Sequence, residues 1–168
     1  MKNALKQAFL SLGSNLGDRE AHLLEALKRL EAAGIHSLRR SSIYETEPQD
    51  LPDQPWFLNL VVEAETGLFP RLLLARIQAI ELGMGRRREV AEVAKGPRPI
   101  DIDILLFENF IIDTRELHVP HPRMNERRFV LEPLAELAPD LLHPVNGKTV
   151  REMLSENQSQ IVKPWHGV

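Results

Sequence analysis

The order of strand-like and helix-like segments is the feature that most constrains what this chain can fold into. Apolar residues recur at helical spacing in two places, one from Arg19 to a stop at Gly34 and the other from Pro70 to Gly83-Met84-Gly85. The expected strands are residues 7–12, 41–46 and 56–65 and the segment that holds Asp101 and Asp103. The resulting order is strand, helix, strand, strand, helix, strand. It is typical of the ferredoxin-like βαββαβ plan, an α+β fold with one antiparallel sheet and both helices on one face.

The remainder of the chain adds shorter elements to this plan. We expect a short strand at residues 110–112, a helical segment near residues 127–137 and a helix near residues 150–155. Residues 161–168 are expected to form a loosely attached tail, because chain ends are often poorly ordered. Residues 1–168 are expected to form a single domain.

Composition narrows the functional class. The chain has no cysteine, which excludes disulfides, a thiolate nucleophile and cysteine metal sites, and fits a reducing compartment. The N-terminus lacks the features of a signal peptide and no apolar segment approaches membrane-spanning length, so we expect a cytoplasmic protein with no membrane partner. A net charge of −3 argues against general nucleic-acid binding. We expect a monomer that acts on small molecules.

An acid pair stands out in the segment from Lys95 to Phe107. Side chains alternate along a strand, so Asp101 and Asp103 face one way while Ile102 and its apolar neighbours face the other. Two carboxylates on a stiff strand suit Mg²⁺, which prefers one or two carboxylates together with phosphate oxygens and water. They also suit the solvated face of an amphipathic strand, and their spacing alone does not decide between these interpretations.

A basic cluster precedes the acid pair. Arg86, Arg87 and Arg88 lie in the expected loop at residues 84–99, where we expect Arg86 and Arg88 to be exposed. Guanidinium groups bind phosphate oxygens bidentately and remain charged at any working pH. A solvated charged loop is the alternative interpretation. Because this loop leads directly into Arg98 and the acid pair, we favour binding of a small polyanion.

Three further motifs are less specific. The turn Gly13-Ser14-Asn15-Leu16-Gly17 lacks the lysine of a P-loop and the dinucleotide fingerprint, so we interpret it as a tight turn from strand to helix. His121, in the segment His118-Val119-Pro120-His121-Pro122, is interpreted as a polar contact or proton relay rather than a zinc ligand. Phe57 and Phe129 are either core residues or the two sides of a flat ligand, and periodicity does not settle which.

Together, these motifs resemble those of the 6-hydroxymethyl-7,8-dihydropterin pyrophosphokinases, a family of folate-pathway enzymes. The resemblance runs from about Phe9 to about Pro144, and its most specific element is Gly96-Pro97-Arg98-Pro99-Ile100-Asp101-Ile102-Asp103. The other blocks are Leu12-Gly13-Ser14-Asn15-Leu16-Gly17, Ser42-Ile43-Tyr44-Glu45-Thr46-Glu47-Pro48, Gln54-Pro55-Trp56-Phe57-Leu58-Asn59, Ile80-Glu81, Gly85-Arg86-Arg87-Arg88, and Val119-Pro120-His121-Pro122 with Arg127 and Phe129.

The resemblance implies a ferredoxin-like fold and transfer of the β,γ-diphosphate of ATP to the pterin hydroxymethyl group, with release of AMP. It implies that Asp101 and Asp103 hold two Mg²⁺ ions and that Arg86 and Arg88 close over the phosphates. The implied nucleotide contacts are Gln78, Glu81, Arg98, Ile104, His118, His121 and Arg127. The implied pterin contacts are Phe57 and Phe129, which stack on the ring, and Asn59 and Thr46, which bind its edge. Where the family often has tryptophan before Gly-Pro-Arg, this chain has Lys95, a candidate phosphate contact.

Two alternatives belong to other classes. A ferredoxin-like module that binds RNA or a partner through residues 86–88 is disfavoured by the adjacent acids and by strands without aromatic stacking motifs. A metal-dependent phosphohydrolase would consume ATP without the pterin.

Overall fold

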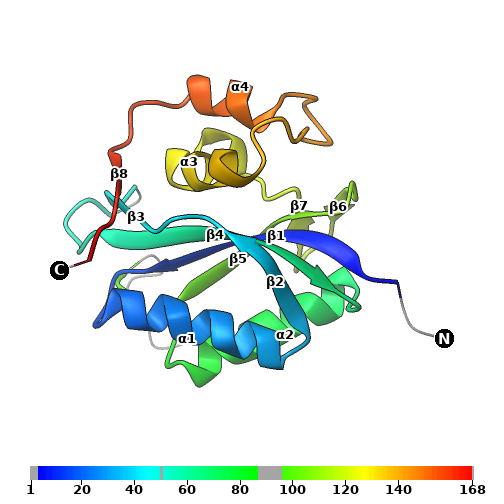
Figure 1. Ribbon diagram of the computed structural model, residues 1–168, viewed down its shortest axis with the longest axis horizontal. Helices are drawn as coiled ribbons and strands as arrows, with labels where there is room; N and C mark the ends of the chain where they lie inside the picture. Colours follow the sequence, from blue (N-terminus) through cyan, green and yellow to red (C-terminus); the bar gives the residue numbers. More distant parts are fainter. Residues whose placement is uncertain (1–3, 50, 87–95, 168) are drawn as a thin grey trace.

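An antiparallel sheet of six strands forms the centre of the computed structural model, which describes residues 4–49, 51–86 and 96–167 (Figure 1). The strand order is β5-β1-β4-β3-β8, and β2 also pairs with β4. In chain order the elements are β1 (Lys6–Ser14), α1 (Arg19–Ala32), β2 (Ile35–Arg40), β3 (Tyr44–Thr46), β4 (Phe57–Thr66), α2 (Pro70–Gly83), β5 (Asp101–Phe107), β6 (Ile112–Asp113), β7 (His118–Val119), a 3₁₀ turn (Met124–Glu126), α3 (Arg128–Leu137), α4 (Val150–Ser155) and β8 (Val162–Pro164).

Helices cover both faces of this sheet (Figure 1). On one face, α1 and α2 contribute Leu23 and Ile77 to a core that also contains Ile102 of β5. On the other face, α3 and α4 close a second core, which includes Leu131 and, from β5, Leu105. Because successive strand residues point to opposite faces, Asp101 and Asp103 lie on the α3 side of β5. The expected pair of helices therefore covers one face, and the C-terminal helices cover the face that carries the acids.

The prediction of a single strand at residues 41–46 was only partly right. The structure has two strands in this region, β2 (Ile35–Arg40) and the shorter β3, and both pair with β4. Only Ile35 of β2 is buried, and the next five residues are exposed. A half-buried strand is predicted from the alternation of apolar and polar residues along it. β2 lacks this alternation, so the sequence gives little indication of it.

The short strand after β5 lies later than expected. It begins at Ile112 instead of residue 110 and pairs with β7. Phe110 instead packs its ring against Phe107, with 5.4 Å between the ring centroids. This aromatic contact holds Phe110 against the end of β5, outside the two-stranded pairing.

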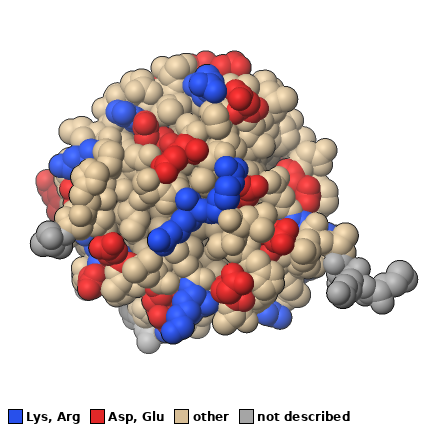
Figure 2. Space-filling model, in the orientation of Figure 1, with Lys and Arg blue, Asp and Glu red and all other residues tan. Residues whose placement is uncertain are grey.

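Charges of both signs are interspersed on the visible face of the molecule (Figure 2). A short run of basic side chains crosses the middle of this face with acidic side chains on both sides, so this face carries no extended basic surface. Within the described ranges, no helix combines the length and the apolar character needed to cross a bilayer.

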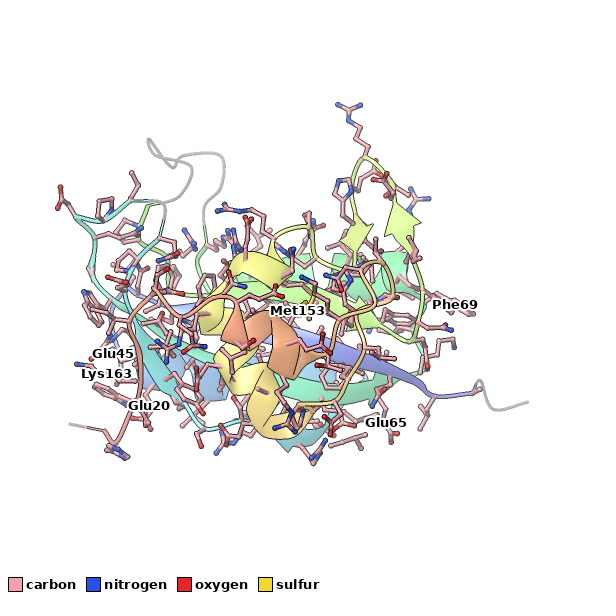
Figure 3. All side chains as sticks on the ribbon, turned by 90° about the horizontal axis from the view of Figure 1, so that it is seen from above. Glu20, Glu45, Glu65, Phe69, Met153 and Lys163 are labelled. Atoms are coloured by element: carbon pink, nitrogen blue, oxygen red, sulfur yellow. The ribbon has the colours of Figure 1, made fainter. Side chains whose placement is uncertain are left out.

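The prediction of a loosely attached C-terminal tail was wrong. Residues Val162–Pro164 form β8, which pairs antiparallel with β3 and so extends the sheet. Figure 3 shows Lys163 beside Glu45 of β3, and their charged groups are 3.7 Å apart. The Trp165 side chain packs against the core to which α1 and α2 contribute, and its backbone N–H donates to the Ile43 carbonyl at 2.9 Å. The tail therefore belongs to the sheet.

We predict that Trp165→Ala lowers the free energy of unfolding by about 2 kcal/mol, because it removes a half-buried indole from the core and a cation–π contact with Arg19. Urea denaturation measures this change. His166→Ala is the control, since His166 is exposed and next to Trp165. Equal stability of the two variants would show that the C-terminal segment is not part of the cooperative unit.

Candidate functional site

A row of paired positions across the sheet builds the floor of the candidate site. Asp101 of β5 lies opposite Gly13 of β1, which lies opposite Asn59 of β4. Side chains at paired positions point to the same face, so Asp101 and Asn59 flank the place of the missing Gly13 side chain. A Cβ at Gly13 would lie 2.5 Å from Oδ1 of Asn59. Glycine at this position therefore leaves the floor open.

A cavity of about 230 Å³ lies above this floor. It brings together ten of the expected site residues from β3, β4, β5, α3 and the connecting loops. These are Thr46, Phe57, Asn59, Arg86, Arg98, Asp101, Asp103, His121, Arg127 and Phe129. Its other lining residues are Ser11, Gly13, Glu47, Gln49 and Gln54.

A second cavity, of about 220 Å³, meets the first at Asp103 and His121, which line both. Its walls include Gln78, Glu81, Ile104 and His118, the remaining described residues that the resemblance assigns to the nucleotide. Since β5 is an edge strand, no neighbouring strand covers one of its two sides. Asp103 thus stands between two cavities of different composition.

The acid pair carries charge that the protein neutralises only in part. Burial, and then the negative charge of Asp101, raise the pKa of Asp103 to about 7. A carboxylate with a raised pKa is one whose ionised form lacks sufficient compensation. A divalent cation beside both oxygens would supply that compensation, and hard carboxylate oxygens are suitable donors for Mg²⁺. The donor set therefore fits magnesium. Among the residues that the structure describes, no group of three or more histidine or acidic side chains forms a complete metal site.

Arg86 binds two carboxylates at once. Its Nη1 atom lies 2.5 Å from Glu81 Oε2 and 2.6 Å from Asp101 Oδ1. Glu81 is buried, and its Oε2 atom also accepts a hydrogen bond from the Ile102 N–H at 2.9 Å. The expectation that Arg86 is an exposed loop residue was wrong, since only 13% of its side chain is accessible. Its removal would therefore cost stability as well as any function. Arg87, Arg88 and Lys95 lie outside the described residues.

In the first cavity, an arginine guanidinium group lies over each of two aromatic rings. The Arg98 guanidinium lies 5.0 Å from the Phe57 ring centroid, and that of Arg127 lies 5.4 Å from the Phe129 centroid. Both pairs are cation–π contacts. Both rings line the cavity, and Phe129 also packs against the second core. Stacking of the two rings on a flat ligand therefore stays a prediction.

Hydrogen bonds fix the polar groups near these rings. Nδ2 of Asn59 donates to Oγ1 of Thr46 at 2.6 Å, and both residues are buried. This bond leaves Oδ1 of Asn59 available as an acceptor above Gly13. The arrangement presents an acceptor and a hydroxyl at fixed positions on the cavity floor.

His121 is neutral in this site. Burial, followed by the positive charge of Arg127, lowers its pKa to about 4. Its Nδ1 atom accepts a hydrogen bond from the Arg123 N–H at 3.2 Å, so the ring proton resides on Nε2. The ring can therefore donate one hydrogen bond without bringing a positive charge. By contrast, His118 is half exposed and contacts Asp113 at 2.7 Å.

Asn15 is a residue whose role the sequence did not suggest. It is buried, its Oδ1 accepts from the Arg98 N–H at 2.8 Å, and its own N–H donates to the Arg98 carbonyl at 3.1 Å. Its Nδ2 donates to Gln54 and to the Pro55 carbonyl. The turn at residues 13–17 is the expected tight turn, and it also positions Arg98. The only signal in the sequence was an asparagine among glycines, which is common in turns.

Comparisons with known proteins agree on one family. The family model described as 7,8-dihydro-6-hydroxymethylpterin-pyrophosphokinase (HPPK) matches residues 9–139. A Bacillus subtilis 2-amino-4-hydroxy-6-hydroxymethyldihydropteridine pyrophosphokinase is 51% identical over 131 residues, which cover 77% of each chain. The protein of the same name from Methylorubrum extorquens is 45% identical over 153 residues, 90% of this chain and 94% of the relative.

Longer proteins also match. The folic acid synthesis protein fol1 of Pneumocystis carinii is 41% identical over 156 residues, 93% of this chain, and the chain spans only 21% of its length. The crystal structure of Plasmodium falciparum HPPK-DHPS A437G with STZ-DHP has a TM-score of 0.74 at 18% identity, over 92% of this chain and 46% of that one. This likeness supports the α+β fold. From the family match and the bacterial relatives, the chain belongs to the 7,8-dihydro-6-hydroxymethylpterin-pyrophosphokinase family.

Proposed function

We propose that this protein transfers the β,γ-diphosphate of ATP to the hydroxymethyl oxygen of 6-hydroxymethyl-7,8-dihydropterin, giving AMP and the pterin diphosphate for folate biosynthesis. The observation that carries the proposal is the position of Asp103, which lines both an aromatic cavity and a second, more aliphatic one. A transfer between two substrates needs their reacting ends to meet at one charged point. The names of the bacterial relatives support the same reaction.

Asp101 and Asp103 would hold the two Mg²⁺ ions of the reaction. When bound, the ions would neutralise phosphate charge and lower the pKa of the pterin hydroxyl. The protein's own contribution is to hold both carboxylates on one face of a strand whose register is fixed by β1. Arg86 occupies Oδ1 of Asp101 in the structure, so we infer that its guanidinium turns to the phosphates when the site is loaded.

The first cavity would bind the pterin. Phe57 and Phe129 would stack on its two faces, and Asn59 and Thr46 would bind its polar edge. Arg98 and Arg127 now lie over those rings, and we infer that they exchange this contact for phosphate oxygens.

The second cavity would bind the nucleotide, through Gln78, Glu81, Ile104 and His118. His121 would donate from Nε2 to a phosphate oxygen without adding charge. Arg88 remains a proposed phosphate ligand.

The finer fold assignment is also a proposal. The order β5-β1-β4, with β2 and β3 both beside β4, supports the ferredoxin-like plan. A cytoplasmic monomer without nucleic-acid partners remains our expectation. The binding-module alternative gains no support from the comparisons, and the engagement of Arg86 by two carboxylates disfavours it.

The product test is direct. Incubation with ATP, Mg²⁺ and 6-hydroxymethyl-7,8-dihydropterin should give AMP and the pterin diphosphate in equal amounts, measured by ion-exchange chromatography. ADP or free phosphate as the main product would overturn the proposal. Consumption of ATP without the pterin would indicate the phosphohydrolase instead.

We predict that Asp103→Asn reduces kcat by at least about 100-fold and yet raises the melting temperature above pH 7 in the absence of Mg²⁺. The pKa of Asp103 is raised on folding, so its ionised form costs stability as the pH rises from about 4 to about 7, and asparagine carries no such cost. Turnover assays and thermal unfolding at pH 8 measure both effects. Asp140→Asn, at an exposed position, should change neither. Lower stability of Asp103→Asn at pH 8 would contradict the charge argument.

We predict a pH dependence for His121. Its pKa is lowered on folding, so the unfolded chain takes up the proton first, and stability falls as the pH drops from about 6.5 to about 4. Over this pH range, the free energy of unfolding of the wild type should fall by about 2 kcal/mol more than that of His121→Asn. Urea titrations at several pH values measure the difference. The matched control is His166→Asn, at an exposed histidine outside the site. Parallel curves for wild type and His121→Asn would show that the ring is not held neutral.

A further inference from the structure

The segment between α4 and β8 runs beside α3 before it joins β3 at the sheet edge (Figure 1). Within it, Gln160 is a buried polar residue, 5% exposed, that none of the motifs above includes. Its side-chain amide touches two segments that line the first cavity. The inference that follows rests on the proposed function.

One end of the Gln160 amide caps α3. The first N–H groups of a helix have no partner within the helix, and Arg127 at the N-cap position supplies no side-chain acceptor. The Phe129 N–H, in the first turn, donates instead to Oε1 of Gln160 at 3.0 Å. The backbone that carries the Phe129 ring is therefore fixed by a residue from the C-terminal segment.

The other end of the amide holds the end of β3. Nε2 of Gln160 donates to the Glu47 carbonyl at 2.9 Å. Glu47 lines the cavity and directly follows Thr46. Two more bonds join this residue to Ile161: the Glu47 N–H donates to the Ile161 carbonyl at 3.2 Å, and the Ile161 N–H donates to Oε1 of Glu47 at 2.8 Å.

Arg128 holds the Gln160 backbone. Its Nη1 atom donates to the Gln160 carbonyl at 2.9 Å, while its Nε atom donates to Glu132 one turn along α3. The Gln160 backbone is thus tied to the same helix that its side chain caps. This leaves the amide little freedom to turn away from Phe129 or Glu47.

We propose that Gln160 is a positioning residue for the pterin side of the site. An amide carries both a donor and an acceptor, and Gln160 uses them to set the distance between the Phe129 wall and the Thr46–Asn59 floor. Because it touches neither cavity, it acts only through these two segments. Its loss should weaken binding of the flat ring and leave the nucleotide cavity, built on α2 and β5, unchanged.

The test is steady-state kinetics on the full chain with Gln160→Met, which conserves side-chain volume and removes both hydrogen bonds. We expect the KM for 6-hydroxymethyl-7,8-dihydropterin to rise about tenfold, while the KM for ATP changes less than twofold and kcat less than threefold. Gln158→Met is the matched control, because this glutamine is exposed and its side chain bonds, among the described residues, only to the Leu154 carbonyl. It should behave as wild type.

Gln160→Glu is a second variant that tests the same role if Gln160→Met folds poorly. The carboxylate still accepts from the Phe129 N–H, but it places an acceptor instead of a donor against the Glu47 carbonyl, so the pterin KM should again rise selectively. An unchanged pterin KM, or equal increases for both substrates, would overturn the positioning role. Wild-type protein that forms no pterin diphosphate would instead overturn the proposed function, so the two failures are distinguishable.

Discussion

The structure of this site depends on two like charges held on one face of an edge strand. Asp101 and Asp103 repel each other, and burial raises the cost of ionising Asp103. Positive groups from two connections converge on this point: Arg86 and Arg98 from the two ends of the α2–β5 connection, and Arg127 from the turn before α3. Each arginine requires a backbone that directs it there. The loops around the acid pair therefore place arginines where they compensate its negative charge, since an uncompensated buried charge is among the most costly features of a fold.

The two helical layers contribute differently to this arrangement. On one face, α2 supplies Glu81, which bonds both Arg86 and the Ile102 N–H and so joins helix, loop and strand at one carboxylate. On the other face, α3 begins at the cavity and places Phe129 in its wall. The edge position of β5 lets both layers act on the same two acids.

Local patterns predicted much of this fold, and long-range contacts account for what they missed. The helical spacing of α1 and α2 and the alternation in β5 predicted these elements, because each depends on neighbours in sequence. The role of Asn15 depends on Arg98, 83 residues away, and that of Gln160 on Glu47, 113 residues away. The burial of Arg86 depends on its contact with Asp101 of β5. Such pairings leave no local pattern, so even correct motifs did not reveal them.

The placement of β8 has a consequence for the chain during synthesis. In the part of the chain that the structure describes, residues Val162–Pro164 pair with the side of β3 that faces away from β4, so β3 remains an open sheet edge until these residues have been synthesised. Open edges pair readily with other chains. Until β8 is in place, β3 is therefore the part of the sheet most exposed to pairing with another chain.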